Sequence, residues 1–180
     1  LVFGGSRGAR AINEAVVAAL PALQGINGKL NIIHQTGEED LETVRAGYRN
    51  AGWRKAEIVP FIDDMENAYR QAQLVVCRAG ATTVAELIAC GRSAILIPYP
   101  YAANDHQTAN ARALAVKGAA MMLGQAELTG ERLAGVTGRL LENQHELIRM
   151  GQIAKSLSRK GAAGRVVEIC RQVSSRKDAA

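Results

Sequence analysis

The stretch Arg78-Ala79-Gly80-Ala81-Thr82-Thr83-Val84-Ala85-Glu86 decides the interpretation of this sequence. It follows the apolar run Leu74-Val75-Val76-Cys77, which is typical of a buried parallel strand. It opens a helical run that stops at Gly91. The turn between strand and helix is built from small residues and leaves backbone N–H groups unpaired at a helix start. Because unpaired N–H groups and the helix dipole both favour negative charge, this turn predicts an anion site.

The acid at the end of this stretch suggests what the anion belongs to. Glu86 is predicted to lie one turn into the helix, on the side that faces the same crevice. A carboxylate repels a phosphate, but it can accept two hydrogen bonds from a ribose diol. Thr82 and Thr83 add hydroxyl donors. Phosphate donors beside a sugar-binding acid indicate a nucleotide site, although an ordinary strand–turn–helix corner with a capping threonine explains this stretch equally well.

A second corner of the same kind begins the chain. Leu1-Val2-Phe3 leads into Gly4-Gly5-Ser6-Arg7-Gly8-Ala9-Arg10, and apolar residues at helical spacing follow from Ile12. Glycines let a backbone approach a ligand closely and tolerate positive φ. The spacing differs from G-x-G-x-x-G, so this corner is not the dinucleotide fingerprint, and a plain βα turn is the alternative interpretation.

Strand-like and helical runs alternate along the rest of the chain. Further strands are predicted at 29–34, 57–60, 93–98 and 119–123, and helices at 38–51, 65–71, 128–141 and 145–173. This order predicts a Rossmann-like three-layer α/β/α domain with a parallel sheet of about six strands. The carboxyl ends of parallel strands share one edge, where ligands bind in open α/β sheets. Four loops are predicted to meet there, around Gly5, Ile62, Gly80 and His106.

Two polar groups in this order have a structural and a functional interpretation. His34 ends a strand, where a lone histidine is more often structural than catalytic. Asp63 or Asp64 can cap the helix that starts at Met65, which explains the paired acids more simply than metal binding or acid–base catalysis.

A third polar group follows the strand predicted at 93–98. Asp105 is expected to cap the next helix. His106, Gln107 and Asn110 beside it suit hydrogen bonds to a sugar and exposure to solvent equally well.

Composition and charge narrow the possible partners. The chain has 180 residues, of which 48% are apolar, enough for one domain with a real core. Aromatic residues are only 4%, so base stacking is not expected on the surface and no nucleic-acid partner is predicted. The net charge is +5; residues 149–180 hold eight Lys or Arg and two Asp or Glu, so the remainder is −1. This basic tail can contact an anionic membrane or a nucleic acid, but a solvated helix face is the more frequent explanation.

The cysteines and the first residues of the chain give expectations about its cellular compartment and its completeness. Cys77, Cys90 and Cys170 are far apart, and their odd number in apolar surroundings predicts reduced, buried thiols in a cytosolic protein. No signal peptide is recognisable, and no apolar run approaches the roughly 20 residues that span a bilayer. The chain starts without Met inside a strand-like run, so we expect it to be a fragment that lacks an N-terminal part.

Four motifs together carry a family resemblance. They are Gly4–Arg10, Phe61–Met65, Cys77–Glu86, and Asp105-His106-Gln107 with Asn110. In this order and spacing the chain resembles the C-terminal half of the bacterial MurG-type transferases, from Leu1 to about Val173. That family has two Rossmann-like domains in the GT-B arrangement and moves N-acetylglucosamine from UDP-GlcNAc to undecaprenyl-pyrophosphoryl-muramyl-pentapeptide. The resemblance implies a donor-binding domain at 1–173, a polar tail at 174–180, and an acceptor-binding N-terminal domain that is absent from the chain.

The resemblance also implies roles for individual residues. The backbone of Ile62 would meet the uracil, Glu86 the ribose hydroxyls, and Ser6 the diphosphate, together with the start of the helix after Gly80. Gln107 and His106 would address the GlcNAc hydroxyls, although some relatives have glutamine at the position of His106. The full implied binding set is Gly5, Ser6, Gly8, Ile62, Met65, Gly80, Ala81, Thr82, Thr83, Val84, Ala85, Glu86, His106, Gln107 and Asn110.

Catalysis is not expected from this chain alone. The resemblance places the general base and the lipid acceptor site in the absent domain, so no catalytic residue is assigned here. It implies no obligatory metal or other cofactor, and a peripheral position on the cytoplasmic face of the plasma membrane. The alternatives are another UDP-sugar GT-B enzyme, such as a lipid glycosyltransferase or an epimerase, and a non-catalytic nucleotide-binding module.

Overall fold

The chain forms one parallel sheet between two layers of helices. A computed structural model describes residues 1–159 and 161–177. The strands lie in the order β3-β2-β1-β4-β5-β6, all parallel. Their bounds are β1 Val2–Phe3, β2 Ile33–Gln35, β3 Glu57–Val59, β4 Leu74–Cys77, β5 Ser93–Leu96 and β6 Met121–Met122. The predicted Rossmann-like α/β/α class and the sheet of about six strands are confirmed.

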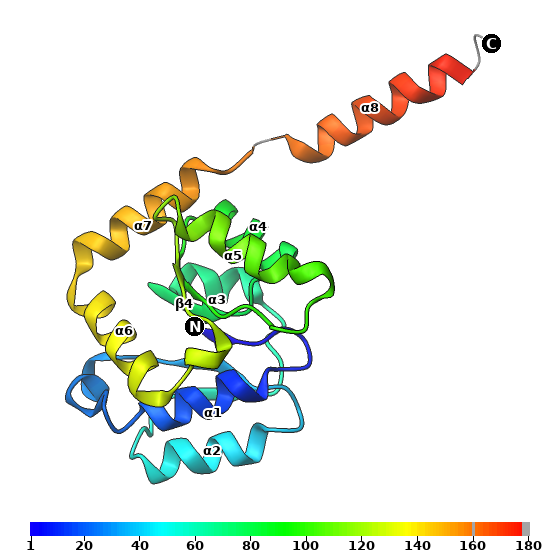
Figure 1. The fold of residues 1–180 in the computed structure, drawn as a ribbon. Helices are drawn as coiled ribbons and strands as arrows, with labels where there is room; N and C mark the ends of the chain where they lie inside the picture. Colours follow the sequence, from blue (N-terminus) through cyan, green and yellow to red (C-terminus); the bar gives the residue numbers. More distant parts are fainter. Residues whose placement is uncertain (160, 178–180) are drawn as a thin grey trace.

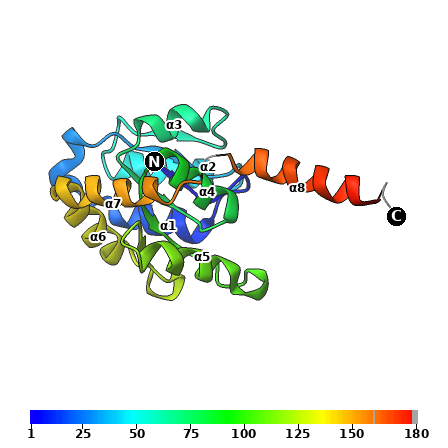
Figure 2. The same cartoon turned by 90° about the horizontal axis from the view of Figure 1, so that it is seen from above.

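Helices cover both faces of this sheet (Figures 1 and 2). One face carries α1 Arg10–Ala19, α2 Leu41–Asn50 and α6 Gly130–Glu142, and the other carries α3 Met65–Gln71, α4 Ala81–Cys90 and α5 His106–Ala115. Three short 3₁₀ helices, η1 Gln24–Lys29, η2 Ala103–Asp105 and η3 Gln125–Glu127, lie in the connections. The helix α7 Gln144–Ser156 packs at the start of β5, where the Ser93 hydroxyl donates to the Leu147 carbonyl at 2.6 Å. The helix α8 Ala162–Lys177 extends away from this body (Figures 1 and 2).

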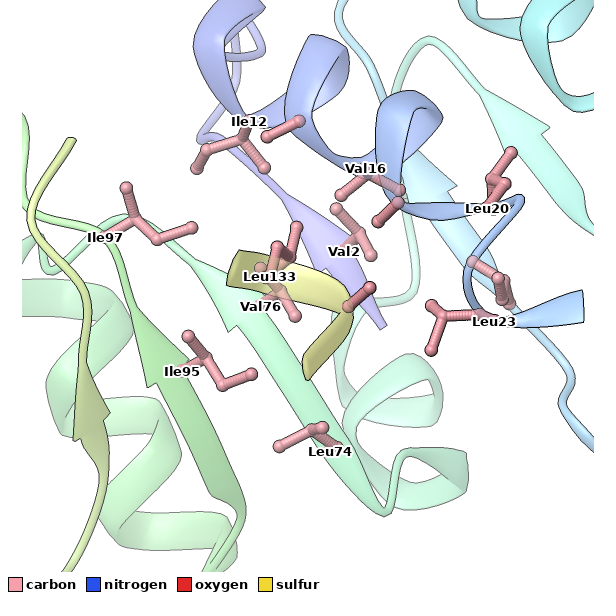
Figure 3. Close-up of a cluster of buried hydrophobic side chains, with 14 of the residues drawn as sticks. Val2, Ile12, Val16, Leu20, Leu23, Leu74, Val76, Ile95, Ile97 and Leu133 are labelled. Atoms are coloured by element: carbon pink, nitrogen blue, oxygen red, sulfur yellow. The ribbon is translucent and has the colours of Figure 1, made fainter. Parts of the chain in front are cut away.

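Two apolar cores hold the layers together. In the first, Ile12 and Val16 of α1 and Leu133 of α6 are directed at Val2 and Val76 in the centre of the sheet (Figure 3). The second core joins the opposite face of the sheet to α3, α4 and α5, and its members include Phe3, Tyr69, Val75, Cys77, Leu87, Leu96, Ala111 and Leu114. Because both faces are covered, the central strands are apolar on both sides, which is why they appear in the sequence as continuous apolar runs.

Three predicted element boundaries are wrong. The strand predicted at 29–34 is shorter, because 24–29 forms the helix η1 and pairing begins only at Ile33. The single helix predicted at 145–173 is two helices, because α7 ends at Ser156 and α8 begins at Ala162, just after Gly161 with its left-handed φ of 78°. The helix α8 continues to Lys177, so the predicted tail at 174–180 begins as helix, and residues 178–180 lie outside the described part.

The prediction of buried thiols holds for one cysteine. Cys77 is buried in β4, and burial raises the pKa of its thiol. Cys90 and Cys170 are exposed, which corrects the prediction for both. Cys90 lies in the last turn of α4. Cys170 lies on α8, which extends away from the body of the domain. The apolar residues beside each cysteine in the sequence therefore do not bury its thiol in a core. Within 1–159 and 161–177, no helix has the length and apolar character to cross a bilayer.

A buried polar network fixes the position of His34, which confirms its structural interpretation. The Asn13 amide donates to the Thr36 carbonyl and to the Asp40 carboxylate, both at 2.9 Å, so its oxygen accepts from His34 Nε2 at 3.0 Å. His34 Nδ1 therefore accepts from the Tyr48 hydroxyl at 3.1 Å. His34 is fully buried, and desolvation lowers its pKa from 6.5 to about 3, so the ring is neutral.

This burial predicts a pH-dependent stability. Between pH 6.5 and about 3 the unfolded chain binds a proton at His34 that the folded chain does not, so the free energy of unfolding falls as the pH falls through this window. One such proton contributes a slope of up to about 1.4 kcal/mol per pH unit. Urea unfolding at pH 7, 6 and 5 measures it. The slope should shrink in His34→Gln and persist in His145→Gln, which changes an exposed histidine; equal slopes in both variants would contradict the assignment.

Candidate functional site

The order of the sheet reverses between β1 and β4, and this reversal creates the crevice. Phe3 lies beside Cys77 in the parallel ladder, so Gly4 and Arg78 leave the sheet side by side. The chain from Gly4 runs to α1 on one face, whereas the chain from Arg78 runs to α4 on the other. Ligands of open α/β sheets bind at such a switch point, beyond the carboxyl ends of the strands. The two glycine loops predicted from the sequence are therefore neighbours at the place where this fold binds ligands.

The loop after β1 is a tight turn that needs its glycines. Gly5 and Gly8 have φ of 97° and 76°, and the Gly8 N–H donates to the Gly5 carbonyl at 2.9 Å. Ser6 is exposed in this turn. A Cβ on Gly8 would collide with the Thr36 carbonyl, so the loop lies backbone to backbone against the end of β2. The Gly8 position is thus fixed by packing against a neighbouring loop.

Gln35 joins this loop to the loop after β3. It is buried at the end of β2; its amide nitrogen donates to the Gly5 carbonyl at 2.8 Å, and its oxygen accepts from the Ile62 N–H at 2.9 Å. The Ile62 N–H is therefore occupied by a protein partner. Two residues on, Asp64 accepts from the Asn67 N–H at 2.9 Å, which confirms the predicted cap of α3. Sequence reasoning did not predict that Gln35 joins these two loops, because both of its partners lie far from it in the sequence.

The start of α4 presents the predicted N–H donors. Gly80 is the N-cap, and no side chain caps the helix there, so the interpretation as a capping threonine is not supported. The Val84 N–H makes the first helical bond, to the Gly80 carbonyl at 2.9 Å, and its side chain packs on the second core. The N–H groups of the three preceding residues, Ala81, Thr82 and Thr83, have no carbonyl partner in the described part of the chain. No acid lies in this first turn, and Ala85 one residue beyond Val84 is exposed.

Glu86 lies in the second turn of α4 and is held by a tyrosine. The Tyr69 hydroxyl on α3 donates to Glu86 Oε2 at 3.0 Å. Tyr69 is buried, whereas Glu86 is half-buried. Met65, at the start of α3, packs partly buried against the same core. The acid lies one turn into α4, as the sequence predicted, but its tyrosine partner was not foreseen.

Arg78 fixes the loop after β5, a role that sequence reasoning missed. One guanidinium nitrogen donates to the carbonyls of Ile97 and Pro98 at 3.2 and 3.1 Å, and the other donates to Gln125 at 2.7 Å. The guanidinium also lies over the Tyr99 ring, 5.4 Å from its centroid. Burial lowers the pKa of Arg78, yet a guanidinium stays charged in proteins. The Arg78 guanidinium thus links the end of β4 to the end of β5 and to the connection after β6.

The polar group in the first turns of α5 is partly committed to hydrogen bonds with neighbouring loops. Gln107 accepts from the Tyr99 N–H at 3.0 Å, and His106 Nδ1 donates to the Ala103 carbonyl at 2.7 Å. Asn110 donates to the Ala79 carbonyl at 3.0 Å, so it supports the turn before α4.

The predicted cap by Asp105 is wrong. Asp105 is the N-cap of α5, but its side chain makes no capping bond. Its φ of 52°, like the 50° of Asn104, is left-handed, whereas a capping side chain requires an extended backbone to reach the N–H groups of the first turn.

Fold and edge together define the class of this protein. A doubly wound parallel sheet with a glycine turn and an uncapped helix start at its switch point is the arrangement of nucleotide-binding Rossmann-like domains. The predicted site residues lie on the loops after β1, β3, β4 and β5, at the start of α3, and in the first two turns of α4 and α5. In the parts of the chain with described coordinates, no group of three or more His, Cys, Asp or Glu side chains could hold a metal ion.

Comparison with known proteins identifies the family. Residues 1–166 match the model of the glycosyltransferase family 28 C-terminal domain, and the chain belongs to this family. A relative from Syntrophotalea carbinolica, named UDP-N-acetylglucosamine--N-acetylmuramyl-(pentapeptide) pyrophosphoryl-undecaprenol N-acetylglucosamine transferase, is 61% identical over 96% of this chain and 48% of its own length. A relative of the same name from Citrifermentans bemidjiense is 52% identical over 93% of this chain and 46% of its own length. The chain spans about half the length of the curated relatives it matches.

A solved structure supports the same assignment. The crystal structure of Acinetobacter baumannii MurG superposes with a TM-score of 0.84 at 37% identity, covering 95% of this chain and 51% of that one. The predicted resemblance to half of a GT-B transferase is thereby confirmed.

The geometry of the glycine turn predicts a graded response to alanine. Gly8→Ala adds a Cβ at left-handed φ and against the Thr36 carbonyl, Gly5→Ala adds only the left-handed strain, and Gly25→Ala adds neither. Left-handed strain costs roughly 1–2 kcal/mol, so the loss of unfolding free energy should follow the order Gly8, Gly5, Gly25. Urea unfolding measures it, with Gly25→Ala expected within about 0.5 kcal/mol of the parent. A Gly8→Ala chain as stable as Gly25→Ala would show that the turn does not need its glycine.

Proposed function

We propose that this chain is the donor-binding half of an inverting glycosyltransferase that uses UDP-GlcNAc. The full protein would transfer GlcNAc to the undecaprenyl-linked muramyl-pentapeptide of peptidoglycan synthesis. The observation that carries the proposal is the placement of an anion-binding helix start and a fixed carboxylate side by side at the switch point. The names of the relatives at 61% and 52% identity supply the sugar and the acceptor.

The parts of the donor would bind to different residues along this edge of the sheet. The diphosphate fits the open N–H groups at the start of α4, with Ser6 and the glycine turn opposite. The ribose hydroxyls fit Glu86, because a carboxylate accepts from both. The uracil fits the Ile62 loop, where the carbonyl of Ile62 is the group to consider because its N–H already bonds to Gln35. The sugar would extend toward Gln107 and His106.

The same arrangement explains how UDP can leave. When the acceptor hydroxyl attacks C1 of GlcNAc, negative charge builds on the β-phosphate oxygen. Fixed N–H groups and the dipole of α4 stabilise that charge without reorganisation, so the proposed mechanism does not require a metal. The acceptor hydroxyl must also lose a proton to a general base. We place that base, and the acceptor site, in the part of the relatives that this chain does not span.

The proposal also places the full protein in the cell. An undecaprenyl-linked acceptor lies in the membrane and a nucleotide sugar lies in the cytoplasm, so the enzyme would work as a peripheral protein on the cytoplasmic membrane face. The basic residues from Arg149 onward can add attraction to anionic lipid. No nucleic-acid partner forms part of the proposal.

Calorimetric titration tests the donor assignment. The chain should bind UDP-GlcNAc more tightly than UDP-glucose or UDP-GalNAc, and should not bind NAD. A preference for NAD would overturn the proposal, and equal binding of the UDP sugars would favour another UDP-sugar enzyme of the same fold. In a transfer assay with lipid acceptor, the chain alone should show no useful turnover; turnover close to that of a two-domain enzyme would refute the assignment of the base to the other half.

Glu86→Ala gives a sharper test of the ribose contact. Loss of charge-assisted hydrogen bonds should weaken UDP binding by about 1.5–3 kcal/mol. Glu66→Ala is the matched control, because Glu66 is a helical acid on the same side of the sheet whose carboxylate pairs with Arg70 in solvent. Calorimetry on both folded variants measures the difference. Unchanged UDP affinity in Glu86→Ala would exclude the ribose role.

A further inference from the structure

Tyr69 is a buried tyrosine whose position suggests a role in the site. It lies on α3, 2% exposed, with its ring edge against Phe3 at 6.0 Å between centroids and an interplanar angle of 83°. The helix α3 begins three residues after Ile62, so Tyr69 is carried by the element that follows the loop proposed to bind the base. Its ring contributes to the core, and its hydroxyl reaches across to α4.

The hydroxyl is a permanent donor to Glu86. It lies 3.0 Å from Glu86 Oε2, and no other side chain in the described part of the chain donates to this carboxylate. Burial first, and then the nearby Cys77 and Glu86, raises the pKa of Tyr69, so the phenol keeps its proton throughout the physiological range. A phenol has one proton to donate, and here it is directed at one carboxylate oxygen.

This single bond decides how the carboxylate is presented. A glutamate has freely rotating bonds, and ordering it on ligand binding costs side-chain entropy. Tyr69 orders it in advance and uses one acceptor position of Oε2. Each carboxylate oxygen has two lone pairs, so Oε1 and the second position of Oε2 remain to accept from two adjacent hydroxyls. Ribose has hydroxyls on two adjacent carbons, 2′ and 3′, whereas 2′-deoxyribose lacks the 2′-hydroxyl and so has no such pair.

We infer that Tyr69 is a positioning residue that gives the site its preference for ribonucleotides over 2′-deoxyribonucleotides by aiming Glu86. This inference rests on the proposed function, because it assigns a role at the same donor site. It also couples two parts of that site, since the helix that follows the base loop orients the acid that reads the sugar.

The test is the ratio of affinities for UDP and 2′-deoxy-UDP, measured by calorimetry on the whole chain. Tyr69→Phe keeps the ring and its contact with Phe3 but removes the donor. UDP affinity should fall about three- to tenfold, the range of a single hydrogen bond, whereas 2′-deoxy-UDP should lose less, so the ratio falls. Tyr48→Phe is the matched control, because it removes an equally buried phenol hydroxyl, bonded to His34, from the other face of the sheet. It should leave the ratio unchanged.

A double-mutant cycle separates positioning from simple loss of stability. In a Glu86→Ala background, Tyr69→Phe should cause no further loss of UDP affinity, because there is no carboxylate left to aim.

The outcomes distinguish this inference from the proposed function. A parent chain that binds neither nucleotide overturns the proposed function itself. A parent that binds UDP with a ribose preference, combined with an unchanged ratio in folded Tyr69→Phe, overturns only the role of Tyr69. Equal losses for both nucleotides, or an additive loss in the Glu86→Ala background, would assign Tyr69 to the packing of the core and likewise overturn its positioning role.

Discussion

The parallel pairing of β1 with β4 is the constraint on which the site depends. These strands lie at the centre of the sheet, where helices cover both faces and where water cannot replace a lost backbone hydrogen bond. The register that sets Phe3 beside Cys77 brings the two loops out together, and the crossovers then carry them to opposite faces. An opening bounded by two backbones is the necessary result. The helix that follows β4 points its positive end into that opening, so the fold supplies an anion site before any side chain is considered.

Side chains then convert four separate loops into one surface. Gln35 joins the loops after β1 and β3, Arg78 joins the ends of β4 and β5, and Asn110 ties α5 to the turn before α4. These groups are wholly or partly buried, and a buried polar group without a partner costs free energy. Each bridge therefore resists the separation of the loops it joins. The edge is preorganised, which lowers the cost of ordering it around a ligand.

The sequence predicted the parts of this molecule that depend on local pattern. Periodicity and turn chemistry act over a few residues, and they predicted the strand–glycine–helix corners and the Asp64 cap. The structural role of His34 was predicted because a lone histidine at a strand end is more often structural than catalytic. The bridges could not be predicted in the same way. Gln35 meets Ile62 across 27 positions, and Arg78 meets Gln125 across 47, and nothing in the local sequence specifies such partners. The exposure of Cys90 likewise depends on which side of α4 faces the sheet.

Two buried phenols illustrate how hydrogen-bonding capacity separates structural from functional polar groups. On one face, Tyr48 donates to His34, which donates to Asn13, whose amide donates to Thr36 and Asp40, so each polar atom of that chain meets a protein partner. Such a network is satisfied by folding and gains nothing from a ligand. On the other face the network is a single bond: Tyr69 donates to the half-buried carboxylate of Glu86, which has further lone pairs to fill. A carboxylate held rigid and left with acceptor capacity is costly to maintain for stability alone, because a solvated, mobile acid loses less entropy. The difference between the two faces is therefore a physical argument that the second polar group is directed at a molecule other than the protein itself.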